Sequence, residues 1–412
     1  MNLSKTTFLS LILTGARTLS GFIISKLIAI QFGPIGLALV GQLQNTIQVA
    51  MLFSQAFITN GVVSIVSQTR NKFHRVKVVS SAIFLTISAS VFVGLLLLIF
   101  SDYVSIFLFS SQENSYLLRI FSFTILFYSL NNLFLSVING LQNLKLLYRI
   151  SIIQTFASFL ITLILIFIGK LQGALLSLVL SQTLVFFLIF FATKNKFSFW
   201  YNCLKKSKKD LKVFIPFMLM GVVSSFSQPI VQLLIRKLVV VQDSFNTAGK
   251  WQAMNYISTT LVTVLISSLS IYYIPKFSQL TDKESIKKEV LVGYKYILPI
   301  LFISFILIVS LKAHIIPFLF SKQFNDIGDL FFYQTLGDCF KILSYIPAYV
   351  MISKLMVKTF LVSELLFGLS QLMLSYFFLH EYGFVGLSYA HAFNYFLYLS
   401  FISFYFWKYF KN

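Results

Sequence analysis

The segment FLSLILTGARTLSGFIISKLIAI, residues 8–30, decides the fold class of this chain. It is almost continuously apolar, and a helix needs about 20 such residues to cross a hydrocarbon core of about 30 Å. The run is too long for the apolar part of a signal peptide and lacks a cleavage site of small residues. We therefore expect a retained first membrane helix, preceded by Lys5.

Eleven further segments of this kind follow, which predicts an all-α polytopic membrane protein with twelve transmembrane helices. Of the 412 residues, 58% are hydrophobic and only 11% are charged, against about a quarter charged in a soluble protein. This composition excludes a soluble enzyme and a disordered chain. The segments lie near 8–30, 37–66, 79–100, 116–140, 150–168, 174–192, 213–236, 251–275, 291–311, 328–352, 360–380 and 387–407.

The formal net charge of +21 would suggest a nucleic-acid partner in a soluble protein, but here it predicts orientation. Most basic residues lie at the termini or in loops on one side, and the positive-inside rule makes that side cytoplasmic. We expect a multi-pass protein of the bacterial inner membrane with both termini in the cytoplasm and no nucleic-acid partner. The basic residues on the other side are Lys170, Arg236, Lys237, Lys250, Lys312 and Lys322.

A basic loop at 193–212 divides the chain into an N-terminal lobe, 1–192, and a C-terminal lobe, 213–412. The loop is either a topogenic linker lying on anionic headgroups or a regulatory docking site. Gly36 and Gly249, in matching loops, are 213 residues apart, and so are Gly173 and Gly386. These equal offsets predict an internal duplication into two pseudo-symmetric six-helix bundles, an organisation typical of transporters.

Signals for catalysis or cofactor binding are missing from the sequence. The two cysteines are far apart, the four histidines lack zinc-site spacing, and no G-x-x-x-x-G-K-[ST] loop is present. We therefore expect a transporter rather than an enzyme, without a metal or other cofactor.

Five basic residues fall inside the predicted segments, where charge is costly and commonly functional. Arg119 and Lys295 lie near segment ends, so their side chains can extend to the headgroups. Arg17 lies near the middle of 8–30 and is a candidate for a water-filled cavity. Lys26 is half a turn out of phase with Arg17, so both reach one cavity only if the helix bends, for example at Gly21. The fifth is Lys341.

Two acidic residues are clearly intramembrane, Asp338 and Glu364. Asp338 and Lys341 are i, i+3 neighbours, with Gln334 and Tyr345 on the same face. This pair either locks its helix structurally or lines a cavity and exchanges partners during transport. Glu364 shares a face with Gln371 and Ser375 and is a candidate for a protonatable coupling residue, driven by a gradient of H⁺ or Na⁺.

Two segments carry stripes of uncharged polar residues that lipid cannot satisfy. These stripes either line a cavity shared by the two lobes or form hydrogen bonds between helices. Pro229 interrupts the seventh segment and is either a hinge or a static kink, and Pro347 has a similar place in the tenth. The stripes comprise Asn45, Gln48, Gln55 and Thr59 in the second segment, and Gln252, Asn255, Thr259 and Thr263 in the eighth.

Several longer strings resemble the Wzx-type flippases, which move lipid-linked O-antigen and enterobacterial common antigen units. They are FGPIGL at 32–37, YYIPKFSQLTD at 272–282, KQFNDIGDLFFYQ at 322–334 and QTLGDCFK at 334–341. The similarity is collinear over nearly the whole chain. It places the chain near the multidrug/oligosaccharidyl-lipid/polysaccharide exporters, which share the fold of MATE transporters and the lipid II flippase.

The resemblance implies alternating access through a V-shaped cleft and a cargo of undecaprenyl pyrophosphate that carries one oligosaccharide repeat, for lipopolysaccharide biosynthesis. Arg17 and Lys26 stand where the family places cations in its first helix. Gly337, Asp338 and Lys341 match a G-D-x-x-K pattern, whereas no basic residue matches in the seventh segment before Arg236. Further partners implied are an O-antigen polymerase and a chain-length regulator.

Three other functions are weighed against a flippase. A MATE-type exporter shares the fold, but its cargo is commonly cationic, which an electropositive cavity disfavours. An O-antigen polymerase is expected to carry a long periplasmic loop, which the segment spacing does not leave room for. A structural scaffold does not need polar residues inside the membrane.

Overall fold

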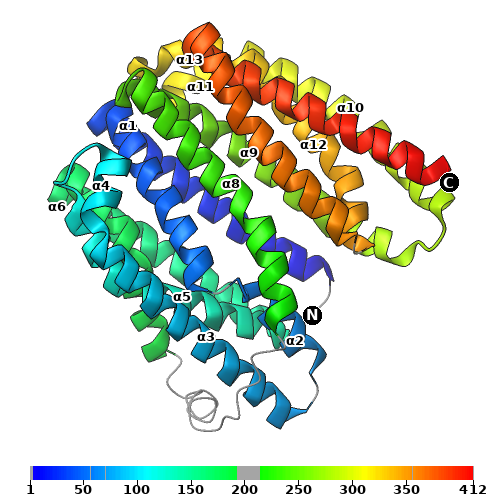
Figure 1. Ribbon diagram of the computed structural model, residues 1–412, viewed down its shortest axis with the longest axis horizontal. Helices are drawn as coiled ribbons and strands as arrows, with labels where there is room; N and C mark the ends of the chain where they lie inside the picture. The colour runs from blue at the N-terminus through cyan, green and yellow to red at the C-terminus, as the bar shows by residue number, and fades with distance from the viewer. Residues whose placement is uncertain (1–2, 56, 70, 193–213, 355, 412) are drawn as a thin grey trace. The chain divides into compact units, whose positions relative to one another are not determined.

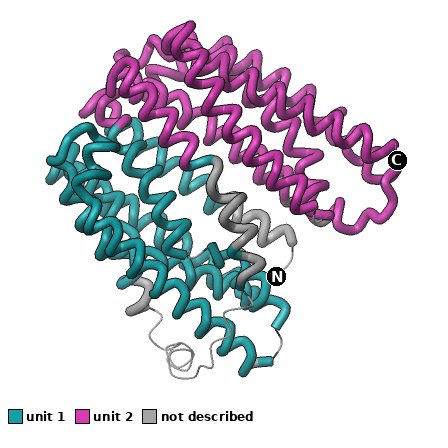
Figure 2. The backbone as a smooth tube through the Cα atoms, viewed as in Figure 1, with its two compact units in different colours: residues 1–28, 39–229 teal, residues 29–38, 230–412 magenta. Residues whose placement is uncertain are grey.

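The computed structural model describes residues 3–55, 57–69, 71–192, 214–354 and 356–411, and every regular element among them is a helix (Figure 1). The chain divides into two compact units (Figure 2). Unit 1 comprises residues 1–28 and 39–229, and unit 2 comprises residues 29–38 and 230–412. The predicted basic linker, 193–212, lies outside the described residues.

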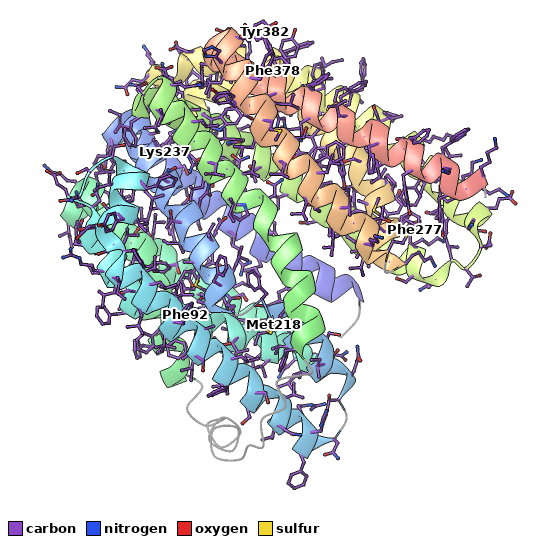
Figure 3. All side chains as sticks on the ribbon, in the orientation of Figure 1. Phe92, Met218, Lys237, Phe277, Phe378 and Tyr382 are labelled. Atoms are coloured by element: carbon purple, nitrogen blue, oxygen red, sulfur yellow. The ribbon has the colours of Figure 1, made fainter. Side chains whose placement is uncertain are left out.

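Unit 1 has a core of branched apolar side chains where three helices meet. Val62 and Val66 of α2 pack with Val79 of α3 and Val137 of α5, and each is fully buried. Met218 of α8 packs against the edge of this core (Figure 3). The helices of unit 1 are α1 (Leu3–Ser54), α2 (Thr59–Gln68), α3 (Lys72–Ile99), α4 (Ser101–Phe109), α5 (Ser115–Gly140), α6 (Leu144–Ala192) and the first half of α8 (Ile215–Gln242).

Unit 2 has a separate core that is richer in aromatic side chains. Phe277 of α9 lies in it (Figure 3), together with Ile346 and Val350 of α12 and Ile402 of α13. The elements of unit 2 are the second half of α8, α9 (Phe245–Gln279), α10 (Lys283–Ser310), α11 (Lys312–Leu319), the 3₁₀ helix η3 (Lys322–Asp329), α12 (Phe331–Ser353) and α13 (Val357–Lys411).

Three of the longest helices are each two membrane-length legs joined by one non-helical residue, which is Gly33 in α1, Lys170 in α6 and Gly383 in α13. With these divided, and with α3, α5, α8, α9, α10 and α12, the described helices match the twelve predicted segments. Exposed apolar side chains such as Phe92, which is 63% exposed, fit a lipid-facing surface (Figure 3). The predicted all-α polytopic fold class is therefore confirmed.

The turns within α6 and α13 have the same construction. Lys170 adopts φ 50° and ψ −132°, and Gly383, 213 residues later, adopts φ 61° and ψ −148°. A side chain at Gly173 would collide with the carbonyl oxygen of Leu165. A side chain at Gly386 would collide with that of Phe378, again 213 residues after its counterpart. These matched turns are what the predicted internal duplication requires.

The bounds of the units differ from those of the predicted lobes at the tip of α1. Residues 29–38 group with unit 2, although both legs of α1 group with unit 1. The backbone of Pro34 lies so close to Gly249 of α9 that any side chain there would overlap it. In addition, the amide oxygen of Gln323 in η3 lies 2.7 Å from the position of a Cβ on Gly33. Close packing thus holds the tip in unit 2.

The boundary between the units also differs within α8. Phe214, just before α8, is fully buried in the core of unit 1, and Met218 packs beside it. The division falls directly after Pro229, the residue that the sequence proposes as a hinge. The first half of α8 therefore groups with unit 1 and the second half with unit 2.

The prediction of one continuous membrane segment over 37–66 is wrong. The helix ends at Ser54 and resumes at Thr59, with Phe57 at φ 56° between them. Other helices supply partners at this break. The Ser54 carbonyl accepts a hydrogen bond from Ser90 Oγ of α3 at 3.2 Å, and Ser54 Oγ lies 2.6 Å from Ser129 Oγ of α5. A break in a membrane helix is tolerated where neighbouring helices satisfy its polar groups in this way.

In unit 2, two lysine side chains from α9 and α11 bind to η3. Lys250 of α9 forms an ion pair with Asp326, and this bond holds the pKa of the Asp326 carboxyl below its usual range. Lys312 Nζ donates to the carbonyl of Gly328 at 3.0 Å. Lys250 and Lys312 therefore have structural partners beyond their predicted topogenic role.

The two equivalent turns predict opposite effects of substitution. A positive φ strains a residue that carries a Cβ but not glycine, at a cost on the order of 1–3 kcal/mol. Lys170→Gly should therefore raise the free energy of unfolding by about 1 kcal/mol, after the entropy cost of a new glycine, whereas Gly383→Ala should lower it. Thermal unfolding of the purified protein in one detergent measures both. A lower midpoint for Lys170→Gly would contradict the strain assigned to this turn.

Candidate functional site

A first polar group in unit 2 joins α8 to α9. Arg236 of α8 donates from Nη2 to Oε1 of Gln252 in α9. One turn earlier in α8, Oε1 of Gln232 accepts a hydrogen bond from Nδ2 of Asn255 at 2.7 Å. We call these four side chains the α8–α9 seam. Of the two interpretations of the stripe in the eighth segment, hydrogen bonding between helices therefore describes Gln252 and Asn255.

Arg236 is a residue that the sequence analysis placed wrongly. It was taken as the last residue of the seventh segment and counted with the basic residues on the other side of the membrane, but it lies inside α8 with 2% of its surface exposed. A buried guanidinium needs hydrogen-bond partners to offset its desolvation, and Gln252 provides one. The spacing of Gln228, Gln232 and Arg236 at four-residue intervals places them on one helical face, and that pattern could have identified it.

A second polar group lies between α9, α12 and α13. Oδ1 of Asp338 in α12 accepts a hydrogen bond from Ser258 Oγ of α9 at 2.7 Å and lies 2.9 Å from Nε2 of His391 in α13. Gln334, one turn before Asp338, donates from Nε2 to Ser258 Oγ at 3.2 Å. We call Ser258, Gln334, Asp338 and His391 the Asp338 cluster. Less than a tenth of either the Asp338 or the His391 side chain is exposed.

Gly337 allows α13 to approach α12 closely enough to form this cluster. A Cβ on Gly337 would lie 3.0 Å from both Cα and N of Ala392 and closer still to the His391 ring. Such distances are tighter than ordinary van der Waals contact. The glycine of the G-D-x-x-K pattern therefore has a packing role, because it brings His391 within reach of Asp338.

Asp338 and Lys341, which the sequence predicts as a pair, take different partners. Lys341 Nζ lies 4.8 Å from the centre of the Tyr395 ring, a cation–π geometry. The Tyr395 ring also makes an edge contact with the His391 ring, with 4.8 Å between centroids. His391 and Tyr395 are one turn apart on α13, so each faces one member of the predicted pair on α12. His391 was missed because the histidines were inspected only for metal-site spacing.

Two of the polar residues in the first leg of α13 are hydrogen-bonded to each other. Nε2 of Gln371 donates to Ser375 Oγ at 3.2 Å, and both residues are buried as their shared face predicts. Glu364 is half-buried two turns earlier, within electrostatic reach of Tyr345 and Tyr398.

In unit 1 the structure does not bring Arg17 and Lys26 together. The backbone is helical on both sides of Gly21, and the interruption of α1 lies at Gly33 instead. Nine residues of continuous helix turn Lys26 to the face opposite Arg17. Arg17 is exposed, whereas Lys26 is half-buried. The bend suggested at Gly21 is therefore not found.

The polar stripe of the second segment is also interrupted. Asn45 and Gln48 lie on α1, but Gln55 lies beyond its end and accepts a hydrogen bond from Thr59 Oγ1 at 2.6 Å. Asn45 is half-buried and Gln48 is exposed. The stripe therefore ends after Gln48 and does not extend over the whole predicted segment.

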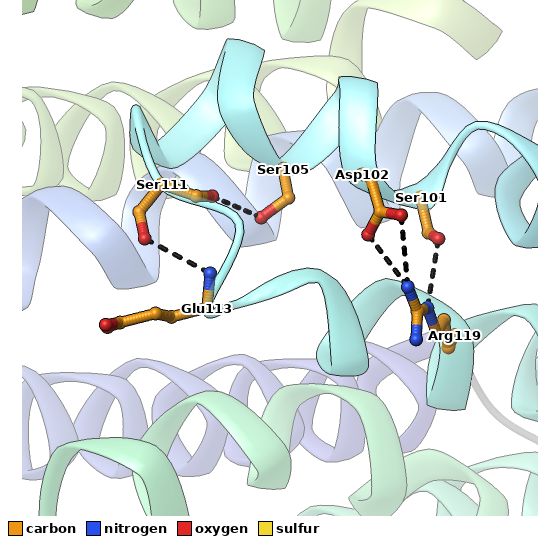
Figure 4. A network of polar contacts seen from close by, with 6 residues as sticks. All are labelled: Ser101, Asp102, Ser105, Ser111, Glu113 and Arg119. Carbon is orange, nitrogen blue, oxygen red and sulfur yellow. Dashed lines mark hydrogen bonds and ion pairs between the residues drawn. The ribbon is translucent and has the colours of Figure 1, made fainter.

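Arg119 has a structural explanation at the start of α5. It donates from Nη2 to both carboxylate oxygens of Asp102 in α4, at 2.8 and 3.1 Å, and from Nε to Ser101 Oγ at 3.2 Å (Figure 4). Half of its side chain is exposed. Nearby, Ser105 Oγ donates to the carbonyl of Ser111 (Figure 4). Arg119 therefore ties α4 to α5 near a helix end, in keeping with the predicted extension towards the headgroups.

Among the side chains that the structure describes, no three His, Cys, Asp or Glu residues gather into a group that could hold a metal ion. The polar interior of unit 2 consists instead of amides, hydroxyls and a few charges at helix–helix contacts. Polar groups inside the membrane segments of a multi-pass helical protein are typical of polytopic membrane transporters.

The chain belongs to the polysaccharide biosynthesis protein family, whose model matches residues 41–329. The lipid III flippases of Escherichia coli (strain K12) and Shigella flexneri are each 25% identical to it over 403 residues, which cover 97% of this chain and 97% of theirs. These comparisons agree with the predicted family in its broad outline.

Solved structures show the same fold. The lipid II flippase MurJ, in an inward closed conformation, aligns with a TM-score of 0.76 and 17% identity, over 97% of this chain and 86% of MurJ. An inward-facing multidrug resistance MATE family transporter aligns with a TM-score of 0.70 and 13% identity, over 95% of this chain and 94% of its own. The proteins named here are flippases and transporters, not enzymes.

Close packing at Gly337 yields a prediction for the Asp338 cluster. Gly337→Ala should force α12 and α13 apart and lower the free energy of unfolding by about 1–3 kcal/mol, the usual cost of overpacking. Gly328→Ala in η3 is the matched control, because its Cβ would meet Ile316 only at 3.6 Å. Thermal unfolding in detergent compares the two. Equal midpoints for both variants and the wild type would show that Gly337 is not required for close approach.

Proposed function

We propose that this chain flips a lipid-linked saccharide from the cytoplasmic to the periplasmic face of the bacterial inner membrane. The observation that carries the proposal is its similarity to two lipid III flippases over 97% of its length. The finer proposal is a cargo of undecaprenyl pyrophosphate bearing one O-antigen or related repeat unit, destined for lipopolysaccharide. An O-antigen polymerase and a chain-length regulator are the partners expected downstream.

Recognition of such a cargo needs cations for the pyrophosphate and hydrogen-bonding groups for the sugars. An unpaired charge costs several kcal/mol or more in hydrocarbon, so the head group requires a polar route. We assign the pyrophosphate to Arg17, because a planar guanidinium matches phosphate oxygens in a bidentate manner and the Arg17 side chain is exposed. Lys26, on the opposite face of α1, is assigned a supporting role outside that contact. The polyprenyl tail stays in the lipid.

The sugar hydroxyls are assigned to amide side chains. Asn45 and Gln48 of α1, and Gln252, Asn255 and Thr259 on α9, are the proposed contacts. Gln252 and Asn255 would exchange their hydrogen bonds within the α8–α9 seam for bonds to sugar. Such an exchange keeps the number of satisfied polar groups nearly constant, which limits its energetic cost.

A small-molecule exporter is the second candidate, favoured by the structural similarity to MATE transporters. A deletion strain distinguishes the candidates. Lipid-linked single repeat units that accumulate facing the cytoplasm support a flippase, whereas an unchanged lipid pool with higher drug sensitivity supports an exporter. Single units already attached to lipid A would instead point to a missing polymerase.

The role of Arg17 predicts a loss of transport on substitution. Arg17→Ala should lower surface polysaccharide at least about tenfold, the effect of losing about 1.4 kcal/mol of binding, and Arg17→Lys should restore part of it. Arg119→Ala is the matched control, because Arg119 has structural partners in Asp102 and Ser101. Surface polysaccharide is measured at equal expression of each variant. Wild-type levels in Arg17→Ala would remove Arg17 from the binding site.

A coupling role for Glu364 predicts a changed response to an ion gradient. Glu364→Gln should flip lipid-linked saccharide in vesicles at similar rates with and without a proton gradient, because the amide cannot bind a proton. Glu381→Gln, at an exposed position of α13, should keep the wild-type response. If Glu364→Gln responds to the gradient like the wild type, Glu364 has no part in coupling.

A further inference from the structure

Asp338 and His391 form a buried acid–base pair in a region where charge is expensive. Their contact of 2.9 Å joins α12 to α13, and more than nine-tenths of both side chains is buried. A carboxylate and an imidazole at this distance can hold a proton between them, and histidine changes its charge near neutral pH when unperturbed. A purely structural contact could be made by neutral residues at lower desolvation cost. The choice of two titratable groups therefore suggests a task that requires titration.

The groups that surround the pair determine what a proton does there. From α12 they are Cys339, Lys341 and Tyr345, and from α13 they are Tyr395 and, further away, Glu364. α9 faces the pair with the neutral hydroxyl of Ser258. α10 faces this part of α12 through the Leu301 carbonyl, 4.0 Å from Cys339 Sγ. Lys341 is thus the basic side chain nearest to the pair along α12, one turn from Asp338.

Two buried amide oxygens next to the pair have hydrogen-bonding capacity left. Oε1 of Gln334, one turn before Asp338, and Oδ1 of Asn394, one turn after His391, are both buried without a hydrogen-bond partner. Each can accept a hydrogen bond from water or from hydronium. Both atoms lie in the protein interior beside the pair, because Gln334 and Asn394 are almost fully buried.

We propose that Asp338 and His391 are the proton-binding pair of unit 2, and that Asp338 alternates between His391 and Lys341 during transport. This inference rests on the proposed flippase function. With Asp338 on His391, the proton on Nε2 lies between the imidazole nitrogen and the carboxylate oxygen, which are 2.9 Å apart. When the carboxylate turns to Lys341, the Nε2–H bond breaks and the proton passes to water. Within this pair only the N–H bond is formed or broken, and no redox step is involved.

The alternation connects proton binding to the proposed sugar contacts. Ser258, which donates to Asp338, lies one turn from Asn255 on α9, and Asn255 bonds to Gln232 of α8. Movement of the Asp338 carboxylate therefore breaks the Ser258 bond and frees α9 to shift against α12. In this way the protonation state of His391 biases the α8–α9 seam, which is the site that we assign to sugar.

A proton-uptake measurement tests the pair without any transport. Between about pH 5 and pH 8, the range in which histidines commonly titrate, the purified full-length protein takes up protons that an indicator dye can count. His391→Gln should bind about one proton fewer than the wild type. His380→Gln, which removes an exposed histidine of α13, is the matched control for the loss of one imidazole. Uptake by His391→Gln equal to that of the wild type would overturn the assignment.

A transport measurement in proteoliposomes tests coupling. The probe is a fluorescent polyprenyl-pyrophosphate-linked oligosaccharide, and a one-unit pH gradient supports up to about tenfold accumulation for one proton exchanged. His391→Gln and Asp338→Asn should hold the accumulation ratio near one at equal amounts of folded protein, whereas His380→Gln should accumulate the probe as the wild type does. Gradient-driven accumulation by His391→Gln overturns the inference alone. A wild type that never moves the probe overturns the proposed function, while the proton count still decides the pair.

Discussion

Hydrocarbon offers no hydrogen bonds, and this constraint shapes each polar feature inside the described helices. A buried donor or acceptor must find its partner within the protein or lose several kcal/mol. In unit 2 the partners come from neighbouring helices, since Gln252 bonds to Arg236, Asn255 to Gln232, and Asp338 to Ser258 and His391. In unit 1 a neighbouring helix also supplies a partner where the helix is interrupted after Ser54, because the Ser54 carbonyl accepts a hydrogen bond from Ser90. Polar residues thus fix which helices lie together.

The same hydrogen bonds can break and re-form while the protein transports its cargo. A hydrogen bond between two neutral or weakly charged side chains contributes only about 1 kcal/mol net, so a polar ligand that offers equal partners can replace it. The α8–α9 seam is suited to such an exchange, because amides both donate and accept. The Asp338 cluster differs, because it joins a carboxyl group to an imidazole. One set of contacts is therefore suited to a cargo and the other to a proton.

Hydropathy and spacing predicted much of the fold. Runs of apolar residues located the twelve segments, and the 213-residue offset indicated the duplication, since both follow from local sequence. The break after Ser54 was missed, because the residues around it are apolar enough to continue a helix and only contacts from α3 and α5 reveal it. The tip of α1 was assigned to the first lobe, because its packing against Gly249 depends on residues far away in the chain.

The site was predicted less completely, for a related reason. The i, i+3 spacing placed Asp338 and Lys341 on one face of a helix, which is correct, but spacing within one helix cannot show what the next helix presents. α13 presents His391 and Tyr395, so each member of the expected pair has another partner. Arg236 was taken as the last residue of its segment because charge alone set that end. Polar residues at four-residue intervals lie on one helical face, and that spacing would have indicated that the helix continues past Arg236.

The central claim is that this chain moves a lipid-linked saccharide across a bilayer, and reconstitution tests it most directly. Purified protein is placed in liposomes with a fluorescent polyprenyl-pyrophosphate-linked oligosaccharide on one leaflet, and a membrane-impermeant quencher reports which leaflet the label occupies. We expect label to become protected in proportion to the protein present, with no change in protein-free liposomes. Protection at the protein-free rate, with a correctly folded chain, would contradict the assignment of this protein as a flippase.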